Sequence, residues 1–309
     1  MGNAPISVLL ANLPDIYLTG ISNLLLNVEH SPFRIVGSTS LDNVMERVRE
    51  LRPHLLLVGL PRKGVDVEGM IIERAEKAMV GIRKQFREVV IAVFAIPGVE
   101  EYQEALAITK KAEVEDVLSL EMGGAELACC LRQLFEQRTE VYKQCLRDLP
   151  IGDGKGYESF AEEVLPLLFK PHFSRFRSQV RRGSGDRLDF VCRNEGQHSF
   201  CKTILRAHGA RYVVFETKNE AMPKVAHLRQ LAAFLTPATT GRFGILLVRQ
   251  PPRQLQTLFK RLGDLLRDDK KMIIVLYDDD VLEMLDMRMR LLEPMSHLEE
   301  RYDYYMMHM

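Results

Sequence analysis

The chain has 309 residues, of which 46% are apolar, so it is long enough for two domains with cores of their own. Its 42 Lys and Arg balance 42 Asp and Glu, and a formal net charge of zero argues against indiscriminate coating of nucleic acid. The sequence has no apolar run of membrane-spanning length and no signal-peptide pattern, so we expect a soluble, cytoplasmic protein without membrane contact. Its five cysteines form no C-x-x-C pair, which favours reduced thiols over structural zinc.

The first 136 residues alternate short apolar runs with helical patterns. Runs rich in Val, Ile and Leu predict buried parallel strands, and the segments between them have the spacing of helices. This alternation predicts a doubly wound α/β sheet. The expected strands are 6–11, 33–37, 55–60, 89–95 and 117–120, and the expected helices are 17–28, 43–51, 70–83, 100–111 and 124–135.

A segment with one Pro and three Gly, at 148–156, predicts the connection between two domains. The helix that precedes it is expected to extend beyond residue 135 before the connection begins. We therefore predict a first domain over 1–136, a helix extension and linker over 137–155, and a second domain over 156–309.

Three stretches of the first domain, at 8–12, 33–42 and 48–61, follow one another as an opening strand, a second strand and a helix leading into a third strand. In this pattern the chain resembles the receiver domains of two-component response regulators over residues 5–136. The resemblance implies a flavodoxin-like fold and a face that binds a protein partner. It also implies a homodimer, because receiver-like domains associate through their fourth and fifth helices.

The resemblance concerns the fold pattern and does not extend to the phosphorylation chemistry. Aspartyl phosphorylation needs a carboxylate nucleophile, an acidic cluster for the metal and a cation for the phosphoryl oxygens. None of these groups is present at the positions where receiver domains carry them, which hold Asn12, Leu13, Gly59, Phe94 or Ala95, and Ser119. We therefore predict no phosphoacceptor and interpret residues 1–136 as a pseudo-receiver domain.

Two strand-like segments of the second domain carry charged residues that suit metal-dependent phosphodiester hydrolysis. Asp189 lies in the first segment, and Glu216 and Lys218 lie in the second, 27 positions later. Side chains alternate along a strand, so Glu216 and Lys218 share a face and Thr217 is expected to point away from it. If the strands are neighbours, the two carboxylates hold one divalent cation, and the ammonium orients a water or stabilises charge on the phosphate.

Further features follow this pattern in order. They are a helical stretch at 156–165 that contains Glu158, a helical stretch at 227–235 that contains Gln230, and a buried strand at 241–249. With the Asp and Glu-x-Lys motif, these features resemble the PD-(D/E)XK nucleases over roughly 157–285, which implies a restriction-endonuclease-like α/β domain. Family members often have Cys in place of Thr217, a small departure because that side chain is expected to point away from the metal.

The resemblance implies a role for each residue of the motif. Asp189 and Glu216 are the expected ligands of Mg²⁺, for which Mn²⁺ is a plausible substitute, and the backbone carbonyl of Thr217 is a third. Lys218 is expected to position or deprotonate the attacking water.

Three helical residues are candidates for supporting roles. Glu158 is expected to bind a second ion or a metal-bound water, and Glu163 is the alternative, because it shares a helical face with Phe160 and Leu167. Gln230 is expected to hydrogen-bond a phosphate or the attacking water. Each of them also fits an ordinary amphipathic helix.

The charges are unevenly distributed along the chain. Up to residue 136 there are 14 Lys or Arg against 19 Asp or Glu, which leaves 28 against 23 in the remainder. The basic excess is sharpest over 170–193, where Arg181, Arg182 and Arg187 are predicted to contact a nucleic-acid backbone. The alternative is a solvated charged hairpin.

These features together predict a Mg²⁺-dependent endonuclease that hydrolyses phosphodiester bonds in DNA. Its pseudo-receiver domain is expected to dimerise or to recruit a partner. A role in prokaryotic restriction or antiviral defence is inferred by family analogy alone. Two alternatives remain, a catalytically inactive nucleic-acid-binding or adaptor protein on the nuclease fold, and a ribonuclease.

Overall fold

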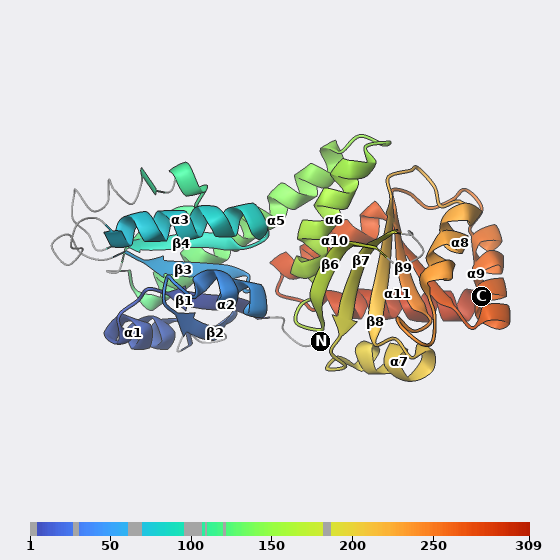
Figure 1. The fold of residues 1–309 in the computed structure, drawn as a ribbon, viewed down its shortest axis with the longest axis horizontal. Coiled ribbons are helices and arrows are strands. Elements are labelled where there is room, and N and C mark those ends of the chain that lie inside the picture. Colours follow the sequence, from blue (N-terminus) through green and yellow to red (C-terminus); the bar gives the residue numbers. More distant parts are fainter. Residues whose placement is uncertain are drawn as a thin grey trace. The chain divides into compact units, whose positions relative to one another are not determined.

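The computed structural model describes residues 5–26, 31–60, 70–95, 107–108, 110–119, 122–181 and 187–309. The chain forms two compact units (Figure 1). The N-terminal unit runs to Glu140, and the C-terminal unit runs from Val141 to Met309.

A five-stranded sheet forms the centre of the N-terminal unit. Its strands are all parallel and lie in the order β2-β1-β3-β4-β5, which is the flavodoxin-like order. Every residue of β1, β3 and β4 is buried, as expected of parallel strands covered on both faces. The predicted doubly wound fold is thus confirmed for this unit. The strands are β1 (Ile6–Ala11), β2 (Phe33–Thr39), β3 (Leu55–Gly59), β4 (Val90–Ala95) and β5 (Asp116–Ser119).

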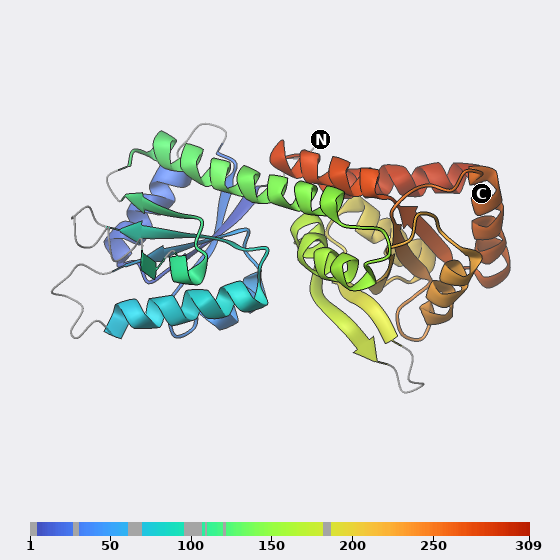
Figure 2. The same cartoon turned by 90° about the horizontal axis from the view of Figure 1, so that it is seen from above.

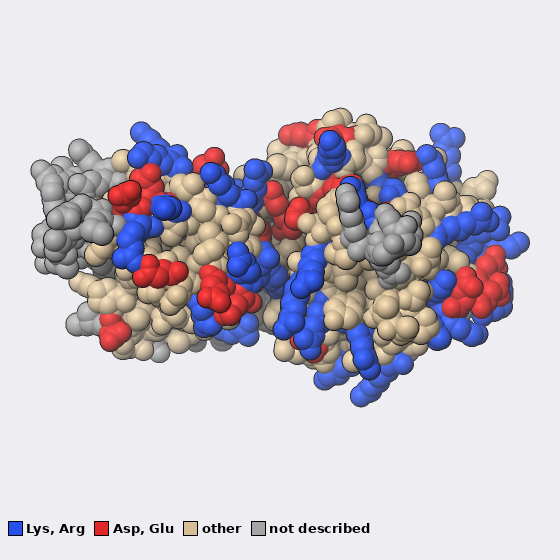
Figure 3. Space-filling model, viewed as in Figure 1, with Lys and Arg blue, Asp and Glu red and all other residues tan. Residues whose placement is uncertain are grey.

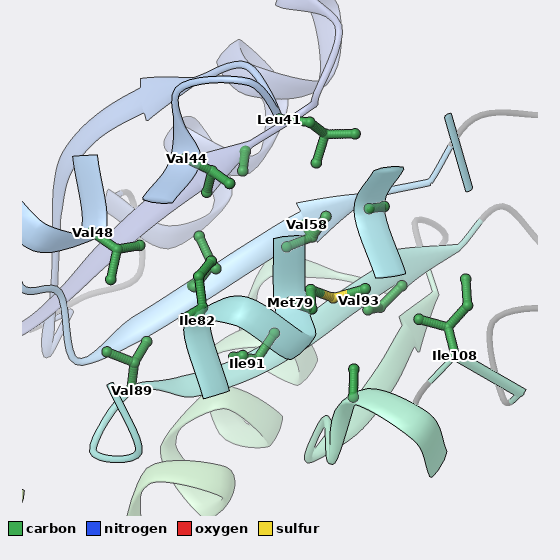
Figure 4. Packing of buried hydrophobic residues seen from close by; sticks show 14 of the residues in the cluster. Leu41, Val44, Val48, Val58, Met79, Ile82, Val89, Ile91, Val93 and Ile108 are labelled. Atoms are coloured by element: carbon green, nitrogen blue, oxygen red, sulfur yellow. The ribbon is translucent and has the colours of Figure 1, made fainter. Parts of the chain in front are cut away.

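Helices cover both faces of this sheet, and α3 and α5 lie on opposite sides of it (Figure 2). Between the sheet and the helices α2 and α3 lies an apolar core in which Val48, Ile82 and Ile91 are completely buried (Figure 4). The predicted helix over 100–111 falls largely outside the described residues. The described helices are α1 (Asp15–Leu26), α2 (Val44–Leu51), α3 (Met70–Gln85) and α5 (Gly124–Asp148).

A mixed five-stranded sheet, in the order β10-β9-β8-β7-β6, forms the centre of the C-terminal unit. The strand β7 is antiparallel to both of its neighbours, and β8, β9 and β10 are parallel. The second domain is therefore mixed α/β as predicted, and its assignment to the restriction-endonuclease-like fold stays a prediction. The strands are β6 (Phe173–Arg181), β7 (Arg187–Asn194), β8 (Tyr212–Lys218), β9 (Phe243–Val248) and β10 (Met272–Leu276).

In the part of this unit that the structure describes, six helices follow α5, and none of the described helices in either unit is both long and apolar enough to span a bilayer. The helix α6 packs against β6 and β8, and α8 packs against β8 and β9. At the start of α10, the Asp280 carboxylate accepts a hydrogen bond of 2.8 Å from the Tyr277 amide, which caps the helix. The six are α6 (Gly154–Phe169), α7 (Ser199–His208), α8 (Val225–Phe234), α9 (Leu255–Asp269), α10 (Asp278–Met289) and α11 (Pro294–His308).

Within the stretch 137–155, for which a helix extension and linker were predicted, α5 continues to Asp148 and a short connection to α6 follows. The boundary between the units falls inside α5, after Glu140. The turn that follows α5 is held within the C-terminal unit, because the Asn219 amide donates hydrogen bonds to the carbonyls of Pro150 (2.9 Å) and Asp153 (2.6 Å). Pro150 and Gly152 lie in this connection between α5 and α6.

The carboxyl end of β3 leaves no room for a side chain. A Cβ atom at Gly59 would lie 2.5 Å from Leu13 Cδ2 and 2.7 Å from the backbone oxygen of Asn12. The Asn12 side chain also donates a hydrogen bond of 2.8 Å to the carbonyl of Gly59. Only glycine fits here, at the position where the receiver resemblance expects the phosphoryl-accepting Asp.

Replacing Gly59 by Asp is therefore expected to destabilise the N-terminal unit by about 2 kcal/mol or more, because the new side chain forces backbone atoms apart. Thermal unfolding of the variant and of the wild type measures the difference. Gly20→Ala is the control, since a Cβ atom at Gly20 meets nothing within 4 Å. A Gly59→Asp protein that unfolds at the wild-type temperature would show that the crowding is easily relieved.

Candidate active site

The pairing of β7 with β8 brings Asp189 and Glu216 to neighbouring positions. The strands are antiparallel with Phe190 opposite Phe215, so one step further along the ladder Asp189 stands beside Glu216. The two residues are only 5% and 0% exposed. Burying two carboxylates together is unfavourable unless other groups compensate, which makes the pair a candidate for a functional site.

Glu216 receives two hydrogen bonds on one of its oxygens and none on the other. Its Oε1 accepts from Lys218 Nζ at 2.5 Å and from Gln230 Nε2 at 2.8 Å. Its Oε2 is buried and has no hydrogen-bond partner. A buried carboxylate oxygen without a partner is costly, so this atom is the open position of the site.

Asp189 accepts hydrogen bonds from both the backbone and the side chain of Thr217, the residue between Glu216 and Lys218. Its Oδ2 accepts from the Thr217 amide at 2.9 Å and from the Thr217 hydroxyl at 3.0 Å. The Thr217 side chain was predicted to point away from the metal, but its hydroxyl contacts Asp189, one of the two predicted metal ligands.

The electrostatics of Glu216 follow from this burial. Loss of hydration raises the pKa of the Glu216 carboxyl to about 7, and the charges of Asp189 and Glu158 act in the same direction. The ion pair with Lys218 lowers the pKa, but it does not offset the burial. A cation placed between the two carboxylates would favour their ionised forms.

These carboxylate oxygens suit a hard divalent cation that keeps several of its water ligands. Oxygen ligands suit Mg²⁺, which is commonly bound through one or two carboxylates. Asp189 and Glu216 supply two, and the unpartnered Oε2 of Glu216 is available as a ligand. Among the described residues, no group of three or more His, Cys, Asp or Glu side chains is arranged to hold a metal ion, so the protein offers two acidic side chains and no closed cage.

Glu158 lies at the rim of the site and is occupied by other partners. Its carboxylate accepts hydrogen bonds from Arg187 at 3.2 Å and from Gln179 at 2.5 Å. All three residues line a cleft of about 310 Å³ between the start of α6 and the strands β6 and β7. Glu158 influences the Glu216 pKa through its charge but makes no described hydrogen bond to Glu216 or Asp189.

The other predicted residues are placed as follows. Glu163 is half-buried, five positions beyond Glu158 on α6. Arg187 is exposed but pairs with Glu158, so the predicted phosphate contact requires it to exchange partners. Arg181 ends β6, and Arg182 lies outside the described residues.

The β6–β7 hairpin nevertheless carries further exposed basic side chains, on Arg175, Arg177 and Arg193. Lys and Arg side chains gather over the part of the C-terminal unit where β6 lies (Figure 3). These three arginines belong to the basic stretch 170–193 that the sequence indicated.

Three polar residues near the site were not predicted. Asn219 and Arg249 directly follow β8 and β9, and His227 lies one turn before Gln230 on α8, where its Nε2 is 3.3 Å from a Glu220 oxygen. Burial lowers the pKa of His227, and the Lys218 charge adds to this effect. Asn219 and Arg249 could have been identified from the sequence, because ligands bind at the carboxyl ends of buried parallel strands and polar residues there are candidates for a site.

Comparison with known proteins gives matches to solved structures only: no family model and no curated protein matches the chain. The chain is similar to the isolated receiver domain of RcsB from Salmonella enterica serovar Typhimurium, with 18% identity over 41% of this chain and 86% of that one, and a TM-score of 0.33. It is also similar to a signal receiver domain of an HD domain-containing protein from Pseudomonas fluorescens Pf-5, with 15% identity over 47% of this chain and 96% of that one, and a TM-score of 0.36. A third match is a LuxR-family DNA-binding response regulator from Staphylococcus aureus, with 14% identity over 42% of this chain and 98% of that one, and a TM-score of 0.33. At these values the fold assignment of the N-terminal unit rests on its strand order.

The raised pKa of Glu216 predicts a pH dependence of stability in protein free of divalent cations. The folded-state pKa, about 7, lies above the ordinary 4.5, so the folded protein holds the proton more tightly than the unfolded chain does. As the pH rises from about 4.5 to about 7, the free energy of unfolding should therefore fall, and Glu216 should contribute up to about 3 kcal/mol of this decrease. Urea unfolding at pH 5 and pH 8, with chelator, should show this fall in the wild type and a smaller fall in Glu216→Gln.

Proposed function

We propose that the protein is a Mg²⁺-dependent endonuclease that hydrolyses phosphodiester bonds in DNA. The observation that carries the proposal is the buried pair of Asp189 and Glu216, with the Lys218 ammonium 2.5 Å from Glu216. An acidic pair that binds a cation, next to one fixed ammonium, suits a reaction in which charge develops on a phosphate.

Each side chain of the site has a defined task in this proposal. Asp189 and Glu216, with the backbone carbonyl of Thr217, would hold the cation, which when bound neutralises the phosphate charge and makes water a better nucleophile. The Thr217 amide and hydroxyl fix the Asp189 carboxylate in one orientation. Lys218, placed by its ion pair, would donate a hydrogen bond to the attacking water or to a phosphate oxygen.

Gln230 and Glu158 would act around this centre. Gln230 holds Glu216 Oε1 and can turn one amide hydrogen to a phosphate oxygen. Glu158 would become available to a second cation or a water when a phosphate attracts Arg187 away from it. Glu163 remains the alternative to Glu158.

A nucleic-acid substrate is supported by the exposed arginines of β6 and β7, one of which, Arg187, lines the cleft that contains Glu158. Phosphate contacts of this kind position a duplex without reading its sequence. The flavodoxin-like N-terminal unit would dimerise or bind a partner, and a dimer would bring two such sites to one duplex.

Cleavage of supercoiled plasmid DNA tests the proposed activity. We expect nicking with Mg²⁺ or Mn²⁺ and none with a chelator. Asp189→Asn, Glu216→Gln and Lys218→Met should each lower the rate by about 100-fold or more, because each removes a cation ligand or the ammonium that orients the attacking water.

Lys202→Met is the matched control for Lys218→Met, since Lys202 is an exposed lysine of the same unit, on α7. It should cleave like the wild type. Equal nicking by the wild type and all three site variants would assign the activity to a contaminant. Binding of DNA without any cleavage would favour the inactive adaptor, and cleavage of RNA alone would favour the ribonuclease.

The N-terminal unit is expected to accept no phosphoryl group. Gly59 provides no nucleophile, and its crowded position admits no side chain. Incubation with a radiolabelled small-molecule phosphodonor should leave the protein unlabelled under conditions that label an intact receiver domain. Stoichiometric, acid-labile labelling would contradict this prediction.

A further inference from the structure

Arg249 is a buried cation, 8% exposed, at the carboxyl end of β9. Its guanidinium donates to the Asp278 carboxylate, to the Asn219 side-chain oxygen at 3.1 Å, and to the carbonyls of Leu149 at 2.8 Å and Leu146 at 3.1 Å. One side chain thus joins the end of α5, the end of β8 and the start of α10. Arginine is almost never buried unless it is paired, and these four hydrogen bonds fix the position of its guanidinium.

Two of these connections lead to residues next to the candidate active site. Asn219 directly follows Lys218, is buried, and ties the strand end to the turn before α6 through Pro150 and Asp153. The amide of Arg249 also donates a hydrogen bond of 3.3 Å to the Glu220 carbonyl, so the backbone on both sides of Asn219 is restrained.

The second connection runs through α6. Tyr157 precedes Glu158, is 1% exposed, and donates a hydrogen bond of 3.1 Å from its hydroxyl to the other oxygen of Asp278. The Arg249 guanidinium lies 5.5 Å from the centre of the Tyr157 ring. The start of α6 and the end of β8 therefore share one anchor.

We propose that Arg249 is a positioning residue for the nuclease site, which it holds together by fixing Lys218 through Asn219 and Glu158 through Tyr157. This inference rests on the proposed function. Arg249 touches neither Asp189 nor Glu216 through any described contact, so it acts on the geometry of the site and not on the reacting atoms. Reactions of this kind are sensitive to such geometry, since a misplacement of about 1 Å costs about 100-fold in rate.

Only an arginine meets the geometric requirement. Its planar fork reaches four acceptors that lie in different directions, whereas lysine offers one ammonium group with three donors. Arg249→Lys keeps the charge but cannot span Asp278, Asn219 and the two carbonyls together. We expect kcat for plasmid cleavage to fall about 10- to 100-fold, with KM within about twofold of the wild-type value.

Arg288→Lys is the matched control. Arg288 is also buried, 3% exposed, and it donates at 2.9 Å to the carbonyls of Leu167 and Lys170 at the opposite end of α6. This variant should lower the melting temperature about as much as Arg249→Lys and leave kcat within about twofold of the wild type.

A second measurement separates positioning from catalysis. Hydrogen exchange of the amides over 216–220, in metal-free protein, should become faster in Arg249→Lys and stay unchanged in Arg288→Lys. If Arg249→Lys does not fold, Tyr157→Phe replaces it, because it removes only the bond to Asp278, and kcat should then fall about threefold or more.

The outcomes distinguish this inference from the function on which it rests. A wild-type protein that cleaves nothing removes the nuclease proposal, while the exchange data still decide whether Arg249 orders the end of β8. Unchanged kcat and unchanged exchange in a folded Arg249→Lys protein would overturn the positioning role. An equal loss of kcat in both arginine variants would assign the effect to general destabilisation.

Discussion

Two carboxylates buried side by side repel each other when both are ionised, and the arrangement around Asp189 and Glu216 compensates for this repulsion. Asp189 accepts hydrogen bonds from the amide and the hydroxyl of Thr217. One oxygen of Glu216 accepts hydrogen bonds from Lys218 and Gln230. One Glu216 oxygen is left without a partner. The nearby strands and helices, together with the Arg249 network, keep these groups at fixed positions. Under the proposed function, a bound cation would offset the remaining repulsion and would take that Glu216 oxygen as a ligand.

The alternation of apolar strands and helices predicted the N-terminal fold, because buried parallel strands leave continuous runs such as 55–59 and 90–95 in the sequence. The residues brought together around Glu216 also followed from the sequence, since alternation along β8 fixes the positions of Glu216 and Lys218 relative to each other. The resemblance to the nuclease motif added Gln230, which contacts Glu216 across a separation of 14 residues.

What the sequence did not reveal depends on contacts between distant segments. Arg249 reaches the carbonyl of Leu146, 103 positions away, and no local pattern distinguishes it from an ordinary arginine after a strand. Arg187 and Glu158 were assigned to different partners because a charge alone does not indicate which opposite charge it meets. The turn after α5 resembled a linker for the same reason, as its anchor, Asn219, lies 69 positions further along the chain.

The packing around Gly59 has a consequence for how this fold can change over generations. The nearest polar obstacle to a side chain there is the backbone oxygen of Asn12, which no mutation of Asn12 removes. Asn12 itself adopts a left-handed conformation, with φ of 53°, that keeps this oxygen in place. Placing an acidic side chain at the end of β3 would require the segment after β1, with Asn12 and Leu13, to be rebuilt at the same time. A single substitution at Gly59 is therefore not sufficient, and the packing keeps the end of β3 free of a carboxylate.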